Sequence, residues 1–307
     1  MMRSNKIVFF GNERLATGVA TTAPVLQSLI AAGYEVTAVV AQYEASRTRK
    51  PRPLEVAEVA AQHNIPMLLP TKLSEVAEIL STSGAEVGVL VAYGKIVPQS
   101  IIDIFPRGIV NIHPSMLPKH RGPTPLESVI LAGDDQTAVS LMSLGAKMDA
   151  GPIYAQLPVT LIGNETKQQL ADKLIEVGKT MLLEHLPAII NGDMVPTEQD
   201  DSQASYDKLI TKDNAIIDWQ LPAAIIERQV RAYALWPKSK TQIGGIDVIV
   251  TSAHILEESG TPGVIWLKDG QIGIHTTDGV LVFDELIPAG KKPMSGSDFV
   301  RGYRPTL

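Results

Sequence analysis

The sequence predicts an α/β protein in which an open, mostly parallel, Rossmann-like sheet domain is followed by a small C-terminal β-barrel of the OB-like type. Three observations favour this fold. The first ~200 residues alternate short β-rich runs with helical patterns, as successive βα units do. Residues 87–92 form a continuous apolar run, which is typical of a central parallel strand covered on both faces. Towards the C-terminus, short strands are separated by glycine-containing hairpin signals.

Each expected element follows from its apolar periodicity and from the residues that stop it. Strands are expected over residues 6–10, 36–41, 67–69, 87–92, 108–113, 138–143 and 153–160. Helices are expected over residues 23–32, 54–63, 73–80, 99–104, 126–132 and 165–190. In the last third, a helix over residues 223–234 precedes short strands punctuated by Gly244-Gly245, Asp269-Gly270 and Asp278-Gly279.

Domain boundaries are predicted from the sequence pattern near residue 192, where the alternation of strands and helices ends and a polar stretch begins. Residues 1–191 form the sheet domain, and residues 207–307 form the barrel domain. Residues 192–206 are polar and acidic with little apolar periodicity, so they are expected to form a linker.

The composition is that of a globular protein. The chain has 307 residues, of which 45% are hydrophobic and 20% are charged. The absence of cysteine excludes a disulfide scaffold, a Cys-ligated metal and a thiolate nucleophile. The longest apolar run, residues 87–94, is far shorter than the roughly 20 residues of a membrane span. A cytoplasmic location with no membrane attachment is therefore expected.

The charge pattern is acidic overall and basic at one place. The formal net charge of −6 argues against a protein whose whole surface binds nucleic acid. Residues 47–52 nevertheless hold four of the 27 basic residues. This segment is either a solvated loop or a phosphate-binding segment, because clustered Arg and Lys side chains release counterions from a nucleic-acid backbone.

Asn111 and His113 are the first candidate functional residues. Side chains two apart in a strand share a face, so these two project together while Ile112 opposes them. The pair lies at the carboxyl end of an expected strand, which is where open α/β sheets bind ligands. Structural hydrogen bonds that satisfy both side chains are the alternative. Prolines 114, 118, 123 and 125 stiffen the loop that follows.

Asp149 is the third candidate. It is either a turn former or a partner of His113 that orients the ring, stabilises the imidazolium and leaves the other ring nitrogen free for the substrate. No histidine has the spacing of a metal site, so no metal is expected. The first βα turn lacks the glycine spacing of a dinucleotide site or a P-loop, and Ser115 lacks a nucleophile elbow.

Several of these motifs together resemble a known superfamily. Asn111-x-His113, Ser115–Pro118, Arg121-Gly122 and Met148–Gly151 resemble the active-site signature of enzymes that transfer the formyl group of 10-formyltetrahydrofolate. The run Val91–Pro98 resembles the strand and turn beside the folate site. In the C-terminal third, Ile217–Trp219, Arg231-Ala232, Trp236-Pro237 and Ala289–Met294 are similar to the methionyl-tRNA formyltransferase family.

The resemblance implies a function and a role for each matched residue. It implies formyl transfer from 10-formyltetrahydrofolate, without a metal, to the free amino group of initiator methionyl-tRNA, by a monomer whose barrel assists tRNA binding. The implied catalytic residues are Asn111, His113 and Asp149. The implied folate contacts are Tyr93, Gly94, Ser115, Met116, Leu117 and Pro118. The implied tRNA contacts are Arg47, Arg49, Lys50, Arg52, Lys291 and Lys292.

The chain also departs from the family pattern at two loops and after the histidine. It has Gly11-Asn12-Glu13-Arg14 where the family usually has Gly-Thr-Pro, and Pro114 where glycine usually follows the histidine. The basic loop differs as well. Two alternatives therefore stay open, namely a formyltransferase for an amino-sugar nucleotide and a non-catalytic RNA-binding homologue.

Overall fold

The computed structural model describes residues 5–42 and 54–305, which form two compact units. The first unit comprises Met1–Leu126, Gln136–Thr160 and Gln168–Lys208. The second unit comprises Glu127–Asp135, Leu161–Lys167 and Leu209–Leu307. Two short segments from the middle of the chain therefore belong to the second unit.

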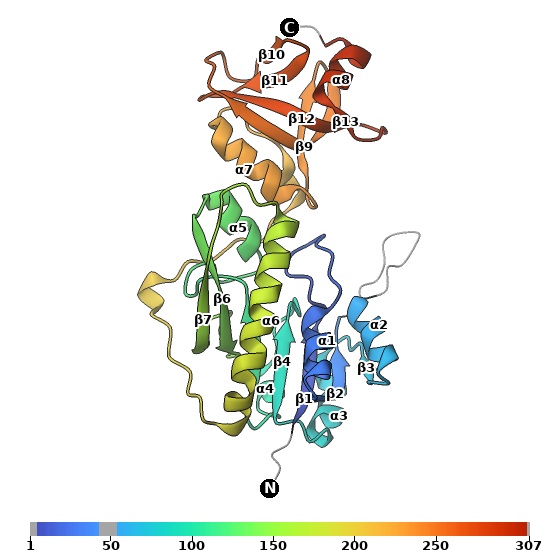
Figure 1. The fold of residues 1–307 in the computed structure, drawn as a ribbon, viewed down its shortest axis with the longest axis vertical. Coiled ribbons are helices and arrows are strands. Elements are labelled where there is room, and N and C mark those ends of the chain that lie inside the picture. The colour runs from blue at the N-terminus through green and yellow to red at the C-terminus, as the bar shows by residue number, and fades with distance from the viewer. Residues whose placement is uncertain (1–4, 43–53, 306–307) are drawn as a thin grey trace. The chain divides into compact units, whose positions relative to one another are not determined.

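A seven-stranded sheet forms the centre of the first unit, among the residues described (Figure 1). Its strand order is β3-β2-β1-β4-β5-β6-β7. The first five strands in this order run parallel, whereas β6 pairs antiparallel with both β5 and β7. This confirms the open, mostly parallel sheet. The strands are β1 (Lys6–Gly11), β2 (Glu35–Val40), β3 (Met67–Leu68), β4 (Val87–Val91), β5 (Ile109–His113), β6 (Gln136–Ser143) and β7 (Ile153–Thr160).

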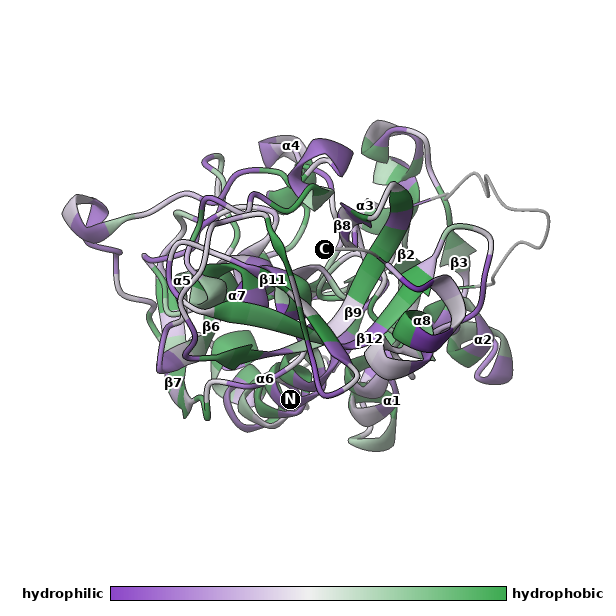
Figure 2. Ribbon diagram, turned by 90° about the horizontal axis from the view of Figure 1, so that it is seen from above, coloured by the Kyte–Doolittle hydropathy of each residue, from purple (hydrophilic) through white to green (hydrophobic). Residues whose placement is uncertain are grey.

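The helices of this part of the chain follow the apolar periodicity with one difference. They are α1 (Pro24–Ala31), α2 (Glu55–Gln62), α3 (Ala77–Thr82), α4 (Gln99–Ile102), α5 (Pro125–Ala132) and α6 (Lys167–Asn191). The single helix predicted over residues 73–80 is instead a 3-10 turn, η1 (Leu73–Val76), followed by α3. In Figure 2 the strands are largely hydrophobic in colour, whereas α2 and α4 carry hydrophilic stretches.

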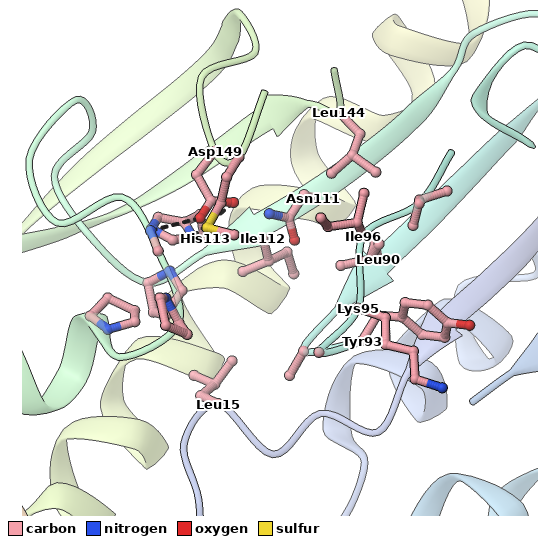
Figure 3. Close-up of a pocket in the computed structure, with 18 of the residues that line it drawn as sticks. Leu15, Leu90, Tyr93, Lys95, Ile96, Asn111, Ile112, His113, Leu144 and Asp149 are labelled. Carbon is pink, nitrogen blue, oxygen red and sulfur yellow. Dashed lines mark hydrogen bonds and ion pairs between the residues drawn. The ribbon is translucent and has the colours of Figure 1, made fainter. Parts of the chain in front are cut away.

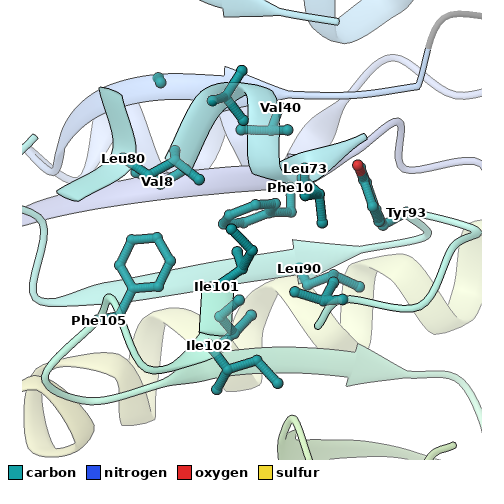
Figure 4. Close-up of a cluster of buried hydrophobic side chains, with 14 of the residues drawn as sticks. Val8, Phe10, Val40, Leu73, Leu80, Leu90, Tyr93, Ile101, Ile102 and Phe105 are labelled. Atoms are coloured by element: carbon teal, nitrogen blue, oxygen red, sulfur yellow. The ribbon is translucent and has the colours of Figure 1, made fainter. Parts of the chain in front are cut away.

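Phe10 lies at the centre of a buried cluster on one face of the sheet (Figure 4). Its ring packs edge-on against Tyr93 and Phe105, with centroid distances of 6.1 and 5.9 Å. Edge-to-face pairs of this kind add about 0.5–1.5 kcal/mol to the hydrophobic gain. Because Tyr93 lies two residues after the end of β4, this packing fixes the turn at the carboxyl end of the central strand.

The opposite face of the sheet is covered by α6, which approaches β5 closely. A Cβ atom on Gly178 would lie 2.6 Å from the Cγ2 atom of Ile112, so only glycine fits at this crossing. Ile112 therefore points towards α6. The alternation predicted for β5 agrees with this contact of Ile112, and its neighbours Asn111 and His113 both line a cavity.

The first loop contains a buried carboxylate that caps a helix. The Glu13 carboxylate accepts hydrogen bonds from the backbone N–H groups of Val25 and Leu26 at the start of α1, each at 2.8 Å. Burial raises the pKa of Glu13 to about 7, although the two backbone hydrogen bonds oppose the rise. The folded protein thus holds a proton on Glu13 more tightly than the unfolded chain does.

Glu13 should make stability fall as the pH rises from its ordinary pKa of 4.5 to about 7. The contribution is fully present below pH 4.5 and is lost at pH values above 7, because only the folded state has the raised pKa. The unfolding free energy of the wild type, relative to Glu13→Gln, should decrease by about 3 kcal/mol over this range. Denaturant unfolding of both proteins at several pH values measures it. A difference independent of pH would contradict the prediction.

The second unit contains a six-stranded antiparallel sheet, among the residues described there. This sheet matches the small barrel that the hairpin signals predict. The strands are β8 (Ser239–Ile243), β9 (Ile246–Leu256), β10 (Ile265–Lys268), β11 (Gln271–His275), β12 (Val280–Pro288) and β13 (Met294–Ser295). Its core includes Ile226 of α7 (Ala223–Tyr233) and Phe299 of α8 (Gly296–Tyr303), and α8 is a helix that the periodicity did not predict.

A buried ion pair joins the segments of the second unit. Lys167 is 0% exposed and Glu127 is 2% exposed. The Lys167 ammonium donates to Oε1 of Glu127 at 3.1 Å and to the carbonyl oxygen of Trp236 at 2.9 Å. Burial lowers the pKa of Lys167, and the charge of Glu127 opposes this. Removing one partner of such a pair costs about 3–5 kcal/mol, because it leaves an uncompensated buried charge.

No helix in the described part of the chain is long and apolar enough to cross a membrane.

Candidate active site

A cavity of about 600 Å³ opens at the carboxyl ends of β1, β4 and β5. The loop between β6 and β7 forms part of its wall. Asn111, His113 and Asp149 lie side by side along one wall, with Leu15 on the facing side and Tyr93 towards the other end (Figure 3). The volume is in the usual range for small-molecule sites. The structure thus brings the three predicted catalytic residues together.

The Asn111 side chain is buried and free to bind a ligand. It is 6% exposed, and its amide makes no hydrogen bond to any residue that the structure describes. The amide atoms are not among the fully buried polar atoms without a partner, because they are accessible from the cavity. The structure thus gives the Asn111 side chain no hydrogen bond to a described residue, and its donor and acceptor face the cavity.

His113 differs from Asn111 because both of its ring nitrogens have a neighbour. Nε2 lies 3.0 Å from the carbonyl oxygen of His120, and Nδ1 lies 3.8 Å from Oδ1 of Asp149. Since a carbonyl oxygen only accepts hydrogen bonds, Nε2 carries the proton of the neutral ring and Nδ1 carries the lone pair. The expectation that the second nitrogen stays free for the substrate is therefore wrong. The nitrogen that can take a proton is Nδ1, beside the carboxylate.

Asp149 is held in a left-handed turn of the loop between β6 and β7. Its φ angle is 48°, a region that Asp tolerates better than most residues. Its Oδ2 atom accepts a hydrogen bond from the backbone N–H of Gly122 at 2.8 Å, while Oδ1 faces His113. Gly122 has a φ of 117°, so a side chain there would be strained. Asp149 is therefore both a turn residue and the partner of His113.

The segment predicted as a linker, residues 192–206, is part of the first unit and hydrogen-bonds to other residues of it. Thr197 pairs with Ile153 in both directions at 2.8 Å. The guanidinium of Arg121, which is 1% exposed, donates to Gln199, Asp201 and Tyr206. The desolvation of this cation is offset by these bonds, which raise the pKa of Arg121. The segment thus holds Arg121, the residue that precedes Gly122.

The loop of Ser115 to Pro118 is not part of the cavity wall. Oγ of Ser115 donates to the carbonyl oxygen of Lys119 at 2.8 Å, and the carbonyl oxygen of Leu117 accepts from Gln156 at 2.9 Å. Met116 and Pro118 are also absent from the lining, whereas Pro114 belongs to it. The structure therefore does not bring these four predicted folate contacts to the cavity.

Tyr93 and Gly94 do line the cavity, at the turn after β4. The carbonyl oxygen of Tyr93 accepts from the Gln42 side chain, and burial raises the pKa of the Tyr93 hydroxyl. The first loop contributes a further stretch that includes Asn12, Arg14 and Leu15. Its position at the carboxyl end of the first strand is the signal by which the sequence indicates that this loop can touch a ligand.

The predicted tRNA contacts divide into two groups. Arg47, Arg49, Lys50 and Arg52 lie outside the described residues. Lys291 and Lys292 are exposed in the turn between β12 and β13 of the second unit. In the described ranges, no group of three or more His, Asp or Glu side chains is placed to hold a metal ion.

The arrangement is suited to reactions in which negative charge develops on an oxygen. A donor amide next to an imidazole can stabilise an oxyanion, and the lone pair at Nδ1 can accept a proton. The Asp149 carboxylate then compensates the charge of the imidazolium. Acyl transfer to a nucleophile has these requirements.

Comparison with known proteins agrees with this chemistry. The formyl transferase family matches residues 5–186, and the formyl transferase C-terminal domain matches residues 209–304. The methionyl-tRNA formyltransferase of Chloroflexus aurantiacus is 39% identical over 305 residues, covering 97% of this chain and 96% of that protein. The enzyme of that name from Roseiflexus castenholzii is 37% identical over 310 residues, covering 99% of this chain and 97% of that protein.

A solved structure shares the fold. The N-formyltransferase from Helicobacter canadensis, in complex with folinic acid and dTDP-3-aminofucose, has a TM-score of 0.68 at 18% identity. The match covers 92% of this chain and 98% of that one. With both family domains present in order, and with relatives of this identity matched along almost their whole length, the protein belongs to the formyl transferase family.

Proposed function

We propose that the protein transfers the formyl group of 10-formyltetrahydrofolate to the free amino group of methionyl-tRNA, with initiator tRNA as the acceptor. The observation that carries the chemistry is the unpaired Asn111 amide in the cavity, next to the His113–Asp149 pair. The choice of acceptor is supported by the full-length relatives, which are methionyl-tRNA formyltransferases.

The folate donor supplies an activated formyl carbon, and the residues of the chain act on its oxygen and on protons. The Asn111 amide donates to the formyl oxygen as it becomes an oxyanion, which is worth about 10²–10³ in rate. Nδ1 of His113 accepts a proton from the attacking amine, and Asp149 stabilises the resulting imidazolium. A carbon–nitrogen bond forms to the amine while the bond to the folate N10 breaks, and the proton returns to N10.

The tRNA contacts are proposed to be local clusters of positive charge, since the chain carries a net charge of −6. Arg47, Arg49, Lys50 and Arg52 form one cluster, and Lys291 and Lys292 form another. A monomer acting in the cytoplasm is part of the same proposal. Light scattering at the concentration of the assay tests whether the protein is a monomer.

Neutralising Arg47, Arg49 and Lys50 together with glutamine should weaken tRNA binding and flatten its salt dependence. The slope of log K against log salt should fall by about 0.7–0.9 for each phosphate contact removed. Filter binding over a range of salt concentrations measures the slope. Lys6→Gln is the control, because Lys6 begins β1 at the end of the sheet opposite the cavity. An unchanged slope in the triple variant would mean that this segment does not reach phosphates.

The function is tested with purified protein, labelled 10-formyltetrahydrofolate and alternative acceptors. Formylation of methionyl-tRNA at a kcat/KM far above that for dTDP-linked amino sugars is the expected result. The reverse order would assign the protein to sugar formylation. Folate binding without formyl transfer to either acceptor would indicate a protein that is not a catalyst of this reaction.

A further inference from the structure

The turn that presents Asp149 to His113 has few bonds of its own. Ala146, Lys147 and Met148 are exposed, and within the turn the Ala150 N–H reaches the Lys147 carbonyl oxygen at a long 3.4 Å. Asp149 also has the left-handed conformation that a non-glycine residue keeps only when its surroundings enforce it. An external contact must therefore hold this turn.

Gln199 supplies that contact from residues 192–206. Its side-chain amide nitrogen donates to the carbonyl oxygen of Asp149 at 2.9 Å and to that of Gly151 at 2.7 Å. Both N–H groups of the amide are thus used on the two carbonyl groups that flank Ala150. These bonds fix the backbone on both sides of the turn.

The amide oxygen of the Gln199 side chain is also held in place. Its Oε1 atom accepts from Nε of Arg121 at 3.1 Å and from Nη2 at 2.8 Å. Arg121 in turn exchanges backbone hydrogen bonds with Ser205 and Asp207, at 3.0 and 2.7 Å. The next residue, Gly122, donates its N–H to the Asp149 carboxylate. The backbone and the carboxylate of Asp149 are therefore held by one connected set of bonds.

We propose that Gln199 is a positioning residue for formyl transfer, which orients Asp149 towards His113 through the Asp149 and Gly151 carbonyl groups. Gln199 is absent from the cavity wall, so it acts on the reaction only through the turn. This inference rests on the proposed roles of Asp149 and His113. Small displacements of a catalytic group cost up to about 10²-fold in rate, which sets the size of the effect.

Gln199→Glu keeps the contact with Arg121 and removes the contact with the turn. The carboxylate still accepts from Arg121, with the added attraction of opposite charges, but it has no N–H for the two carbonyl groups. We expect kcat for formylation of methionyl-tRNA to fall by about 10- to 100-fold. Both KM values should stay within a factor of about two, because a residue outside the cavity adds no binding energy to either substrate. The temperature of unfolding should fall, because two carbonyl oxygens lose their donor and face a carboxylate oxygen.

Gln203→Glu is the matched control, because Gln203 lies in the same segment and its side chain is exposed and bonded only to Asp200 among the residues described. It should have wild-type kinetics. Gln199→Ala removes both sets of bonds, and should lose stability as well as kcat. Each variant is assayed below its unfolding temperature, so that a loss of kcat refers to folded protein.

A double-mutant cycle with Asp149→Asn gives the decisive result. If Gln199 acts through Asp149, then Asp149→Asn/Gln199→Glu should be no slower than Asp149→Asn alone. Effects that multiply in the double variant, or a wild-type kcat in folded Gln199→Glu, would overturn the inference. A wild-type protein that formylates no methionyl-tRNA would instead overturn the proposed function, so the two failures are distinguishable.

Discussion

Replacing His113 with alanine should lower kcat for formyl transfer by about 10²- to 10⁴-fold, the usual contribution of a positioned acid–base group. The variant loses the Nδ1 lone pair beside Asp149, and therefore the group that moves the proton from amine to folate. It also leaves the Asp149 carboxylate without its cationic partner in the reaction. Single-turnover kinetics with saturating folate and methionyl-tRNA measures the chemical step.

His63→Ala is the matched control for this experiment. His63 is exposed at the end of α2 and contributes nothing to the cavity, so its variant should retain the wild-type kcat. Circular dichroism and folate binding establish that the His113 variant is folded and binds its donor. A His113 variant within a few-fold of the wild-type kcat would contradict the assigned role.

Replacing Asn111 with alanine should lower kcat by about 10²- to 10³-fold while leaving the protein as stable as before. The loss of rate follows from the loss of the donor to the oxyanion. Stability is preserved because the Asn111 amide has no hydrogen bond among the described residues that the substitution could break. Most buried polar residues would instead lose about 1–3 kcal/mol on truncation.

Asn111→Asp sharpens the test, since it keeps the shape of the side chain and exchanges a donor for a negative charge. It should be at least as impaired as the alanine variant. Asn164→Ala, at an exposed position, should behave as the wild type. Denaturant unfolding and steady-state kinetics on all three proteins provide the comparison. A large loss of stability in Asn111→Ala would show that the amide has a structural role.

The order of strands and helices in the first unit could be predicted because it depends on local patterns. The apolar run of β4 and the alternation of β5 each arise within a few residues, and these two strands position the cavity. The helix α8 was missed although Ser295 caps it by accepting from the Asp298 N–H. Its eight residues contain two glycines at its first and seventh positions, which weakens any helical signal.

The residues that line the candidate site could be predicted from the sequence, whereas the groups that hold those residues in place could not. Asn111, His113 and Asp149 lie at strand ends or in a turn, where ligand sites of α/β sheets occur. The neighbour of His113 at Nε2 is a backbone carbonyl oxygen, which any residue could provide. Gln199 lies 50 residues from Asp149 in the chain. No periodicity marks such a contact, because it depends on tertiary packing alone.

The buried pair of Lys167 and Glu127 has a consequence for the order of events during synthesis. Both residues leave the ribosome long before Trp236, whose carbonyl oxygen takes one hydrogen bond of the Lys167 ammonium. A nascent chain that ends at Lys208 has every strand of the seven-stranded sheet but lacks the surroundings that its residues 127–135 and 161–167 have in the finished protein. The Lys167–Glu127 pair therefore obtains its last hydrogen-bond partner only after Trp236 has been translated, so the second unit, which is built from three separate stretches of the chain, should fold late in synthesis.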